Sequence, residues 1–365
     1  MATATEQQIL DALKTIIDPV AGRDIVTLGM VQGLALNKGH AQFALGIDPA
    51  KAKEYEPLRQ RAERVVAGLA GILSATALLT AEKAAAPAAP RQGPPKISLP
   101  SVRSIVAVAS GKGGVGKSTT TTNLACALAA KGLKVGLLDA DIYGPSQPRL
   151  MGISGKPSSR DGKVMDPMRN HGVKVMSIGF LLDDDKPVIW RGPMVVSALQ
   201  QMLRDVAWGD LDILLVDMPP GTGDIQLSMA QTVPLTGSVI VSTPQDIALI
   251  DARRGLAMFR RVEVPVFGFV ENMSYFACPH CGERTDIFGH GGAKEEAAKL
   301  DTDFLGEIPL HLAIRETSDA GTPIVVTDPM SPHSLAYAAI ADKVWGKVEA
   351  ILGGGGRAAP RIVMG

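Results

Sequence analysis

The residues with the clearest chemical meaning lie in VAVASGKGGVGKSTT, residues 106–120. Their glycines fit two phosphate-binding patterns, the G-x-G-x-x-G of dinucleotide folds and the G-x-x-x-x-G-K-S of nucleoside triphosphatases. A triphosphatase also uses Lys117, which reaches the β- and γ-phosphates, and Ser118, whose hydroxyl binds Mg²⁺. Backbone N–H groups and the start of a helix hold the phosphates. We therefore predict an ATP-binding loop made of Gly111, Lys112, Gly113, Gly114, Val115, Gly116, Lys117, Ser118 and Thr119.

Three acids at strand ends favour the triphosphatase interpretation. Asp217 ends the apolar run ILLVD, and Asp139 and Asp141 end LLDAD. Such carboxylates can hold Mg²⁺ or orient an attacking water. Any one of them alone is more simply a helix cap or a turn former, and Asp139 also suits the ribose-binding acid of a dinucleotide fold. We predict Ser118, Asp139 and Asp141 as magnesium ligands and Lys112, Lys117, Asp141 and Asp217 as catalytic residues.

The chain has three cysteines, too few for a disulfide framework, which predicts a reducing, cytoplasmic location. Cys126 lies among small apolar residues of a predicted helix and is expected in the core. Cys278 and Cys281 form a C-x-x-C, which suits a redox dithiol, half of a zinc site or half of an iron–sulfur site. Zinc or a four-iron cluster needs about four ligands, so His280 or His290, or a second chain, has to complete the site.

The elements that position these residues follow from composition and periodicity. Of the 365 residues, 46% are hydrophobic but only 4% aromatic, which suits a parallel sheet buried on both faces. Short apolar strands alternate with helix-like runs from Ser104 onward. We predict an α/β fold with a doubly wound, mostly parallel sheet. Its strands are expected at residues 104–110, 134–140, 213–219, 237–244, 266–272 and 303–309.

Composition also divides the chain. Residues 1–83 predict a small α+β domain of order α-β-β-α, with a turn at residues 37–39 and a last strand near residues 74–79. An Ala/Pro-rich linker is expected at 84–101, the P-loop ATPase domain at 102–352 and a flexible tail at 353–365. A net charge of zero gives no general attraction to nucleic acids. We see neither a secretory signal nor an apolar run of about 18 residues, so we expect no membrane partner.

The segment GKGGVGKS resembles the deviant-Walker class of P-loop ATPases. In that class the extra lysine, here Lys112, crosses a dimer interface to the nucleotide of the partner, where a cation offsets charge in phosphoryl transfer. The resemblance also implies that Asn272, in FVENMS, reads the adenine edge. From chemistry alone, Asn272 is equally well a polar residue that ends a strand.

Nearly the whole chain resembles the Mrp (ApbC-like) family of iron–sulfur cluster carrier ATPases. The segments that carry the resemblance are SGKGGVGKSTTTTNLA, LLDADIYGPSQPRLMG, VIWRGPMV, LLVDMPPGTGD, VSTPQDIAL and VENMSYFACPHCGE, and residues 1–83 look like the cluster-assembly domain of many bacterial members. The resemblance implies a homodimer that holds a labile [4Fe-4S] cluster between two Cys278–Cys281 pairs. It implies ATP-dependent transfer of that cluster, with scaffold proteins and apo iron–sulfur proteins as partners.

Two other functions use a similar loop. One is a positioning ATPase of the MinD/ParA type, which would need a basic amphipathic C-terminal helix or a basic surface. The other is an ATP-gated reductase with a bridging cluster, whose cysteines are spread along the chain. Neither alternative predicts the pair Cys278 and Cys281.

Overall fold

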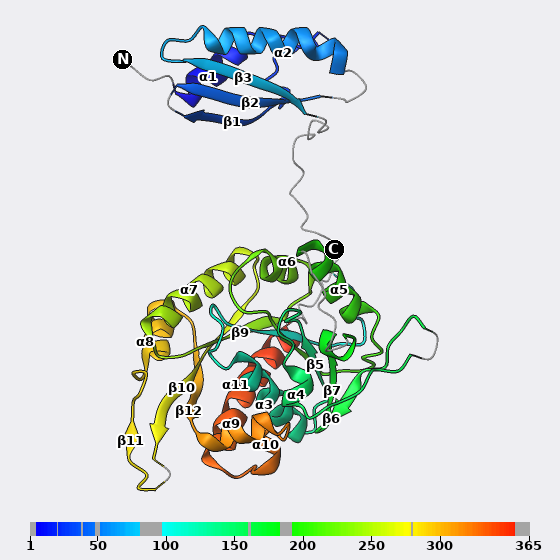
Figure 1. Ribbon diagram of the computed structural model, residues 1–365, viewed down its shortest axis with the longest axis vertical. Helices are drawn as coiled ribbons and strands as arrows, with labels where there is room; N and C mark the ends of the chain where they lie inside the picture. Colours follow the sequence, from blue (N-terminus) through cyan, green and yellow to red (C-terminus); the bar gives the residue numbers. More distant parts are fainter. Residues whose placement is uncertain are drawn as a thin grey trace, which may run out of the picture. The chain divides into compact units, whose positions relative to one another are not determined.

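A computed structural model of the chain describes residues 5–19, 21–37, 39–47, 52–80, 97–159, 162–182, 192–278 and 280–354. Contacts within the chain divide it into two units, Met1–Gln92 and Gly93–Gly365 (Figure 1). Among the helices of the described ranges, none has both the length and the apolar composition needed to cross a membrane.

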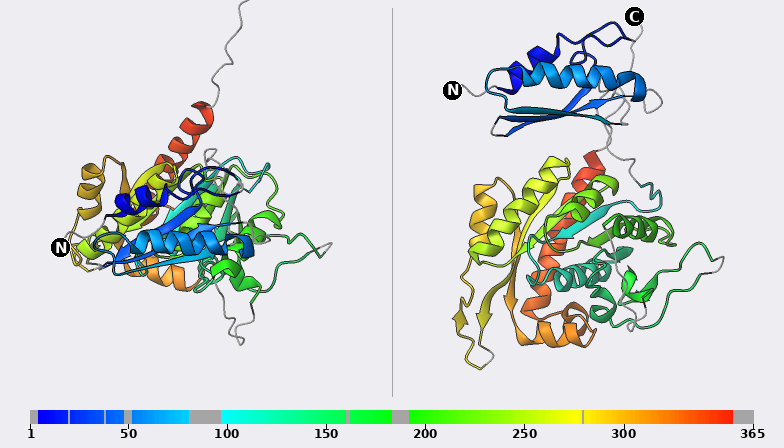
Figure 2. Two further views of the ribbon diagram at one scale, coloured as in Figure 1. Left: turned by 90° about the horizontal axis from the view of Figure 1, so that it is seen from above. Right: turned by 45° about the horizontal axis from the view of Figure 1, so that its top comes forward.

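The first unit folds as a small sheet covered by helices. Its elements are α1 (Glu6–Leu13), β1 (Val31–Asn37), β2 (His40–Gly46), α2 (Ala52–Ala67) and β3 (Ser74–Thr80). β1 and β2 pair antiparallel, and β3 lies parallel to β2, as expected when α2 forms the connection between them. Both helices lie on one face of the sheet (Figure 2). Buried residues from both helices and the sheet form the core, among them Ile9, Leu13, Phe43, Leu45 and Val66.

The second unit is built on a nine-stranded sheet of order β11-β10-β9-β4-β8-β5-β7-β6, with β12 also paired to β10. Six of its strands match the predicted ones: β4 (Ile105–Ala109), β5 (Val135–Asp139), β8 (Ile213–Asp217), β9 (Gly237–Ser242), β10 (Val266–Ala277) and β12 (Phe304–Leu310). Three strands were not predicted: β6 (Met168–Asn170), β7 (Val173–Ser177) and β11 (Arg284–Thr285). The pairs β6–β7 and β10–β11 are antiparallel and the other pairs are parallel.

Helices cover both faces of this sheet, which explains why β4, β5, β8 and β9 are buried throughout. α3 (Lys117–Ala130) and α11 (Pro332–Gly354) pack together on one face, and α5 (Gly192–Arg204), α6 (Asp224–Thr232) and α7 (Asp246–Arg261) lie on the other (Figures 1 and 2). The remaining helices are α4 (Gln147–Leu150), α8 (Gly292–Lys299), α9 (Leu312–Asp319) and α10 (Ile324–Thr327), with a 3₁₀ turn at Ile178–Phe180.

Some predicted segments meet the described residues only in part. Residues 81–83 of the predicted small domain, residues 84–96 of the predicted linker, residues 355–365 of the tail, Lys38 of the turn and residues 188–191 of VIWRGPMV lie outside them. Ile97 and Leu99, which we assigned to the linker, pack against the core of the second unit. Gly353 and Gly354, which we assigned to the tail, end α11.

The register of the sheet decides which acids meet. Asp139 at the end of β5 lies directly opposite Asp217 at the end of β8, and Asp217 also pairs with Val108 of β4. Because the carboxyl ends of parallel strands share one edge, the loops after β4, β5 and β8 converge there.

Candidate nucleotide-binding and cysteine sites

The loop between β4 and α3 forms one wall of a cavity of about 310 Å³. Gly114 and Gly116 have φ values of +83° and +78°, which side chains rarely adopt, so this curled path depends on glycine. Gly116 also begins α3 as its N-cap, which leaves the first N–H groups of the helix for a ligand. The cavity is lined by Ser110, Gly113, Gly114, Gly116, Lys117, Ser118, Thr119, Asp141, Gly144, Ser146, Leu150 and Pro220.

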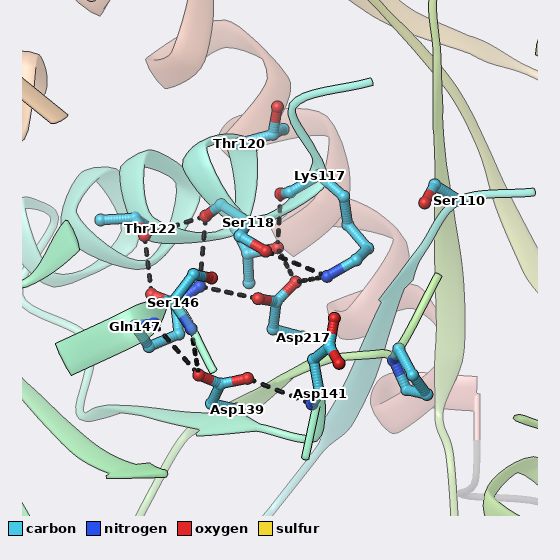
Figure 3. Close-up of polar contacts among 12 residues, drawn as sticks. Ser110, Lys117, Ser118, Thr120, Thr122, Asp139, Asp141, Ser146, Gln147 and Asp217 are labelled. Atoms are coloured by element: carbon cyan, nitrogen blue, oxygen red, sulfur yellow. Dashed lines mark hydrogen bonds and ion pairs between the residues drawn. The ribbon is translucent and has the colours of Figure 1, made fainter. Parts of the chain in front are cut away.

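Lys117 and Asp217 form a buried ion pair beside this cavity (Figure 3). The Lys117 ammonium lies 2.5 Å from Asp217 Oδ1 and 3.1 Å from Ser118 Oγ. Thr121 Oγ1, one turn further along α3, lies 3.1 Å from Asp217 Oδ1. The first turn of α3 is therefore bonded to the acid at the end of β8.

Asp139 is buried, and donors already surround its carboxylate. Oδ1 accepts the Asp141 N–H, and Oδ2 accepts the N–H groups of Ser146 and Gln147 and the Ser177 hydroxyl. Burial, reinforced by the negative charge of Asp217, raises the pKa of Asp139 to about 7. Asp139 thus holds the loop that carries Asp141, and Asp141 is the acid of this loop that lines the cavity.

Three residues of the predicted loop, Gly111, Lys112 and Val115, are not among the residues that line this cavity. Lys112 is exposed, and its carbonyl accepts the Ser110 hydroxyl at 2.9 Å. Val115 is buried in the core. Gly111 packs so closely on α7 that a Cβ there would lie 2.1 Å from the carbonyl carbon of Asp251.

Asn272 lies in the middle of β10 and reaches the loop from the other side. Its amide Nδ2 donates to the Val115 carbonyl at 2.9 Å. The same nitrogen would lie 2.1 Å from a Cβ placed on Gly116. Asn272 therefore fixes the shape of the phosphate loop, a contact that the sequence did not indicate.

Cys278 and Cys281 lie in the turn between β10 and β11. The Cys278 N–H donates to Glu283 O at 2.9 Å, and the Gly282 N–H donates to Cys278 O at 2.8 Å, which closes the turn. Backbone N–H groups of Cys281 and His280, together with the Cys281 side chain, lower the pKa of the Cys278 thiol and so favour its thiolate. Cys126 is buried in α3, and burial raises its pKa to about 12, so it is not a ligand candidate.

A second polar cluster lies beside this turn. Glu271 is fully buried, and its carboxylate accepts the Ser274 hydroxyl at 2.6 Å and the N–H groups of Gly291 and Ala293 at 2.9 and 2.7 Å. Ser274 Oγ is also 3.0 Å from His290 Nδ1. Sequence reasoning missed this role of Glu271, because nothing in VENMS marks a carboxylate that receives the start of another helix.

His290 is held by this cluster rather than by the cysteines. The Arg284 guanidinium contacts the His290 ring and stacks 4.0 Å over the ring of Tyr275. Among the described residues, one group of three side chains lies close enough together to hold a metal ion: Glu271, His290 and Glu307. This group includes neither Cys278 nor Cys281. The sequence left two ways to complete a site at Cys278 and Cys281: a nearby histidine or a second chain. In this geometry His290 does not serve as the histidine.

Comparison with known proteins follows the same division of the chain. The family described as NUBPL iron-transfer P-loop NTPase matches residues 101–345, and the family described as iron–sulfur cluster assembly protein matches residues 6–79. An iron–sulfur cluster carrier protein of Synechocystis sp. is 45% identical over 351 residues, 94% of this chain and 98% of that protein. The chain belongs to the NUBPL iron-transfer P-loop NTPase family.

One further relative and two solved structures are also similar to this chain. The iron–sulfur cluster transfer protein NUBPL of Dictyostelium discoideum is 54% identical over 258 residues, 70% of this chain and 80% of that protein. A nucleotide-binding protein of Archaeoglobus fulgidus, solved with ADP, is 42% identical with a TM-score of 0.57, covering 64% of this chain and 91% of that one. The cell division ATPase MinD of Pyrococcus furiosus is 22% identical with a TM-score of 0.51, covering 67% and 98%, and shares the fold.

Proposed function

We propose that the protein is an ATP-hydrolysing iron–sulfur cluster carrier that holds its cluster between two copies of the chain. The observation that carries the proposal is the pair Cys278 and Cys281 at the end of β10, the same strand whose Asn272 contacts the phosphate loop. Family membership supports it, because the matched family is one of iron-transfer NTPases. Its cargo is delivered to apo iron–sulfur proteins, and cluster scaffold proteins supply it.

The residues around the cavity fit a Mg²⁺–nucleotide. Two glycines with positive φ values and the first turn of α3 form a cradle for phosphates, and Ser118 and Asp141 supply hard oxygen ligands. Bound Mg²⁺ would neutralise charge on the phosphates. Lys117 has to leave Asp217 to reach a phosphate, and Asp217 Oδ1 then gains room to orient a water while Thr121 and Gln147 still hold the carboxylate. Asp139, which we predicted as a magnesium ligand, is better suited to hold the loop that carries Asp141, because its oxygens already accept four donors.

The cluster is the cargo, and two chains are needed to hold it. A [4Fe-4S] cluster takes about four thiolates, and a two-fold axis that brings two Cys278–Cys281 pairs together supplies them. The lowered pKa of Cys278 suits a thiolate ligand. A site at an exposed turn, shared across a non-covalent interface, gives the cluster a path out. Two free thiols also suit the reducing cytoplasm, where we place the protein.

The surface around Lys112 supports the homodimer. α7 packs directly against Gly111, and on α7 the side chains of Ile247 and Ile250 are 66% and 44% exposed. Exposed apolar side chains on the helix that packs against the phosphate loop suit an interface with a second copy. In that dimer Lys112 reaches the nucleotide of the partner, and Asn272 reads the adenine edge once its amide leaves Val115.

Anaerobic reconstitution with iron and sulfide tests the cluster directly. We expect about four irons per dimer, with the visible absorption of a [4Fe-4S] cluster, in the wild type and in the control Cys126→Ser. The double variant Cys278→Ser/Cys281→Ser should bind none. Tight zinc binding without iron uptake would reduce the protein to an ATPase with a structural metal loop. Rapid redox cycling without cluster transfer would favour the reductase alternative.

A further inference from the structure

Gln147 is a buried side chain that joins three elements next to the phosphate loop (Figure 3). It is the first residue of α4, and its Nε2 donates to Asp217 Oδ2 at 2.8 Å and to the Ser118 carbonyl at 3.2 Å. Its Oε1 accepts from Thr122 Oγ1 at 2.7 Å. Both N–H groups and the oxygen of the amide therefore have partners, so the group is fully satisfied.

The neighbours fix the orientation of this amide. A carboxylate oxygen and a carbonyl oxygen, both acceptors, lie within hydrogen-bonding distance of Nε2. A flipped amide would place its own oxygen against both of them, which is unfavourable in a buried site. The side chain therefore acts as a donor toward Asp217. The Thr122 hydroxyl lies 2.7 Å from Oε1 and 2.9 Å from the Ser118 carbonyl, so its one hydrogen serves two acceptors, of which Oε1 is the nearer.

The backbone of the same residue serves the second acid. The Gln147 N–H donates to Asp139 Oδ2 at 3.0 Å, while its side chain donates to Asp217, the residue opposite Asp139 in the sheet. One residue thus supplies donors to both buried carboxylates. It also bonds the first turn of α3, where Ser118 lies.

We propose that Gln147 is a positioning residue for Mg²⁺–nucleotide binding, an inference that rests on the function proposed above. Lys117 and Thr121 hold Asp217 Oδ1, and Gln147 holds Oδ2, so the carboxylate stays oriented after Lys117 moves to a phosphate. Through Ser118 the same amide keeps α3 in register with Asp217. Gln147 touches the acid and the helix rather than the nucleotide, so its loss should weaken the contribution of Mg²⁺ more than nucleotide binding itself.

The test measures the affinity of a fluorescent ADP analogue, methylanthraniloyl-ADP, with Mg²⁺ and with EDTA. The dissociation constant in EDTA divided by that in Mg²⁺ reports how strongly Mg²⁺ supports binding. In Gln147→Leu we expect this ratio to fall about tenfold, the usual effect of a lost hydrogen bond to a charged group, with little change in EDTA. Thr122→Val, which removes the donor to Oε1, should lower it about threefold.

Ser104→Ala is the matched control. Ser104 is also buried and hydrogen-bonded, to the Asp212 carbonyl, but it precedes β4 at the opposite edge of the sheet. It should lose stability while keeping the wild-type ratio. If Gln147→Leu does not fold, Thr122→Val carries the test. A wild-type ratio in the folded Gln147 and Thr122 variants overturns the inference and leaves the proposed function intact, whereas a wild type that binds no nucleotide overturns the proposed function first.

Discussion

At the scale of single residues, Gly116 carries two constraints at once. Its φ of +78° disfavours any side chain, and a Cβ would lie 2.1 Å from the Asn272 amide nitrogen. We predict that Gly116→Ala lowers the free energy of unfolding of the nucleotide-free protein by about 2–4 kcal/mol, the sum of backbone strain and overpacking. Denaturant unfolding measures this loss.

Gly132→Ala separates the two effects. Gly132 follows the other end of α3 with a φ of +87°, and a Cβ there meets nothing within 4 Å. This variant should cost only the backbone strain, about 1 kcal/mol. Equal losses in the two variants would mean that Asn272 moves away freely and does not fix the loop.

Asp139 makes stability depend on pH. Its pKa is about 7 in the folded protein, against an ordinary value of 3.8, so the folded state keeps a proton that the unfolded state loses. This contribution to the free energy of unfolding is complete below pH 4 and is lost as the pH rises to 7, by at most about 1.4 kcal/mol per pH unit. We predict that the free energy of unfolding of the wild type minus that of Asp139→Asn decreases as the pH rises from 4 to 7.

Unfolding of both proteins at pH 5, 6, 7 and 8 checks the sign. The comparison with Asp139→Asn cancels the titration of other groups that the substitution does not affect. A difference that grows with pH would show that Asp139 is held as a carboxylate, as a group stabilised by its four donors would be.

The roles of residues that belong to a sequence motif could be predicted. The roles of residues that depend on how neighbouring strands align in the sheet could not. Lys117, Ser118 and Asp217 follow from the loop pattern and from an acid at a strand end, and the structure brings them together. Gln147 belongs to no such pattern. Its role depends on Asp139 and Asp217 lying opposite each other and on the path of the loop between β5 and α4, which only the folded chain defines.

At the scale of elements, β10 connects the two halves of the site. Near the middle of β10, Asn272 contacts the phosphate loop and Glu271 accepts the N–H groups at the start of α8. Cys278 directly follows the end of β10. We predict that Glu271→Gln costs about 2–3 kcal/mol of stability, because the amide nitrogen would face a backbone N–H. It should also raise amide hydrogen exchange at Gly291 and Ala293, measured by mass spectrometry.

Glu307→Gln makes the same chemical change nearby. Its side chain is 37% exposed and contacts Ser274 and His290 only loosely, at 3.4 and 3.7 Å. Its loss should stay within about 0.5 kcal/mol. Similar effects of the two substitutions would show that negative charge, rather than the bonds to α8, is what the cluster needs.

The predictability of the elements followed their burial. Four of the six predicted strands, β4, β5, β8 and β9, lie at the centre of the sheet, where burial on both faces leaves a strong apolar pattern. The other two, β10 and β12, are buried only in part but still contain several buried apolar residues. β6 and β11 have three and two residues and are antiparallel additions, too short for any periodicity. β7, VKVMS, carries a lysine within its apolar run and borders the sheet edge that β6 covers.

At the scale of the whole molecule, the function proposed above requires two copies of the chain. Lys117 is buried next to Asp217 in its own chain, whereas Lys112 is exposed. If Lys112 acts on the nucleotide of the partner, the two lysines of one active site come from different chains. Defects at the two positions should then complement each other, as isologous interfaces allow.

We predict that Lys112→Ala and Lys117→Ala are each inactive as ATPases and that mixing them restores activity. In a mixed dimer, one site combines the intact Lys117 of one chain with the intact Lys112 of the other, and the second site has neither. With random exchange, half of the dimers are mixed, so phosphate release should return to about a quarter of the wild-type rate. If Lys112 served its own chain, every site would lack one lysine, and mixing would restore nothing.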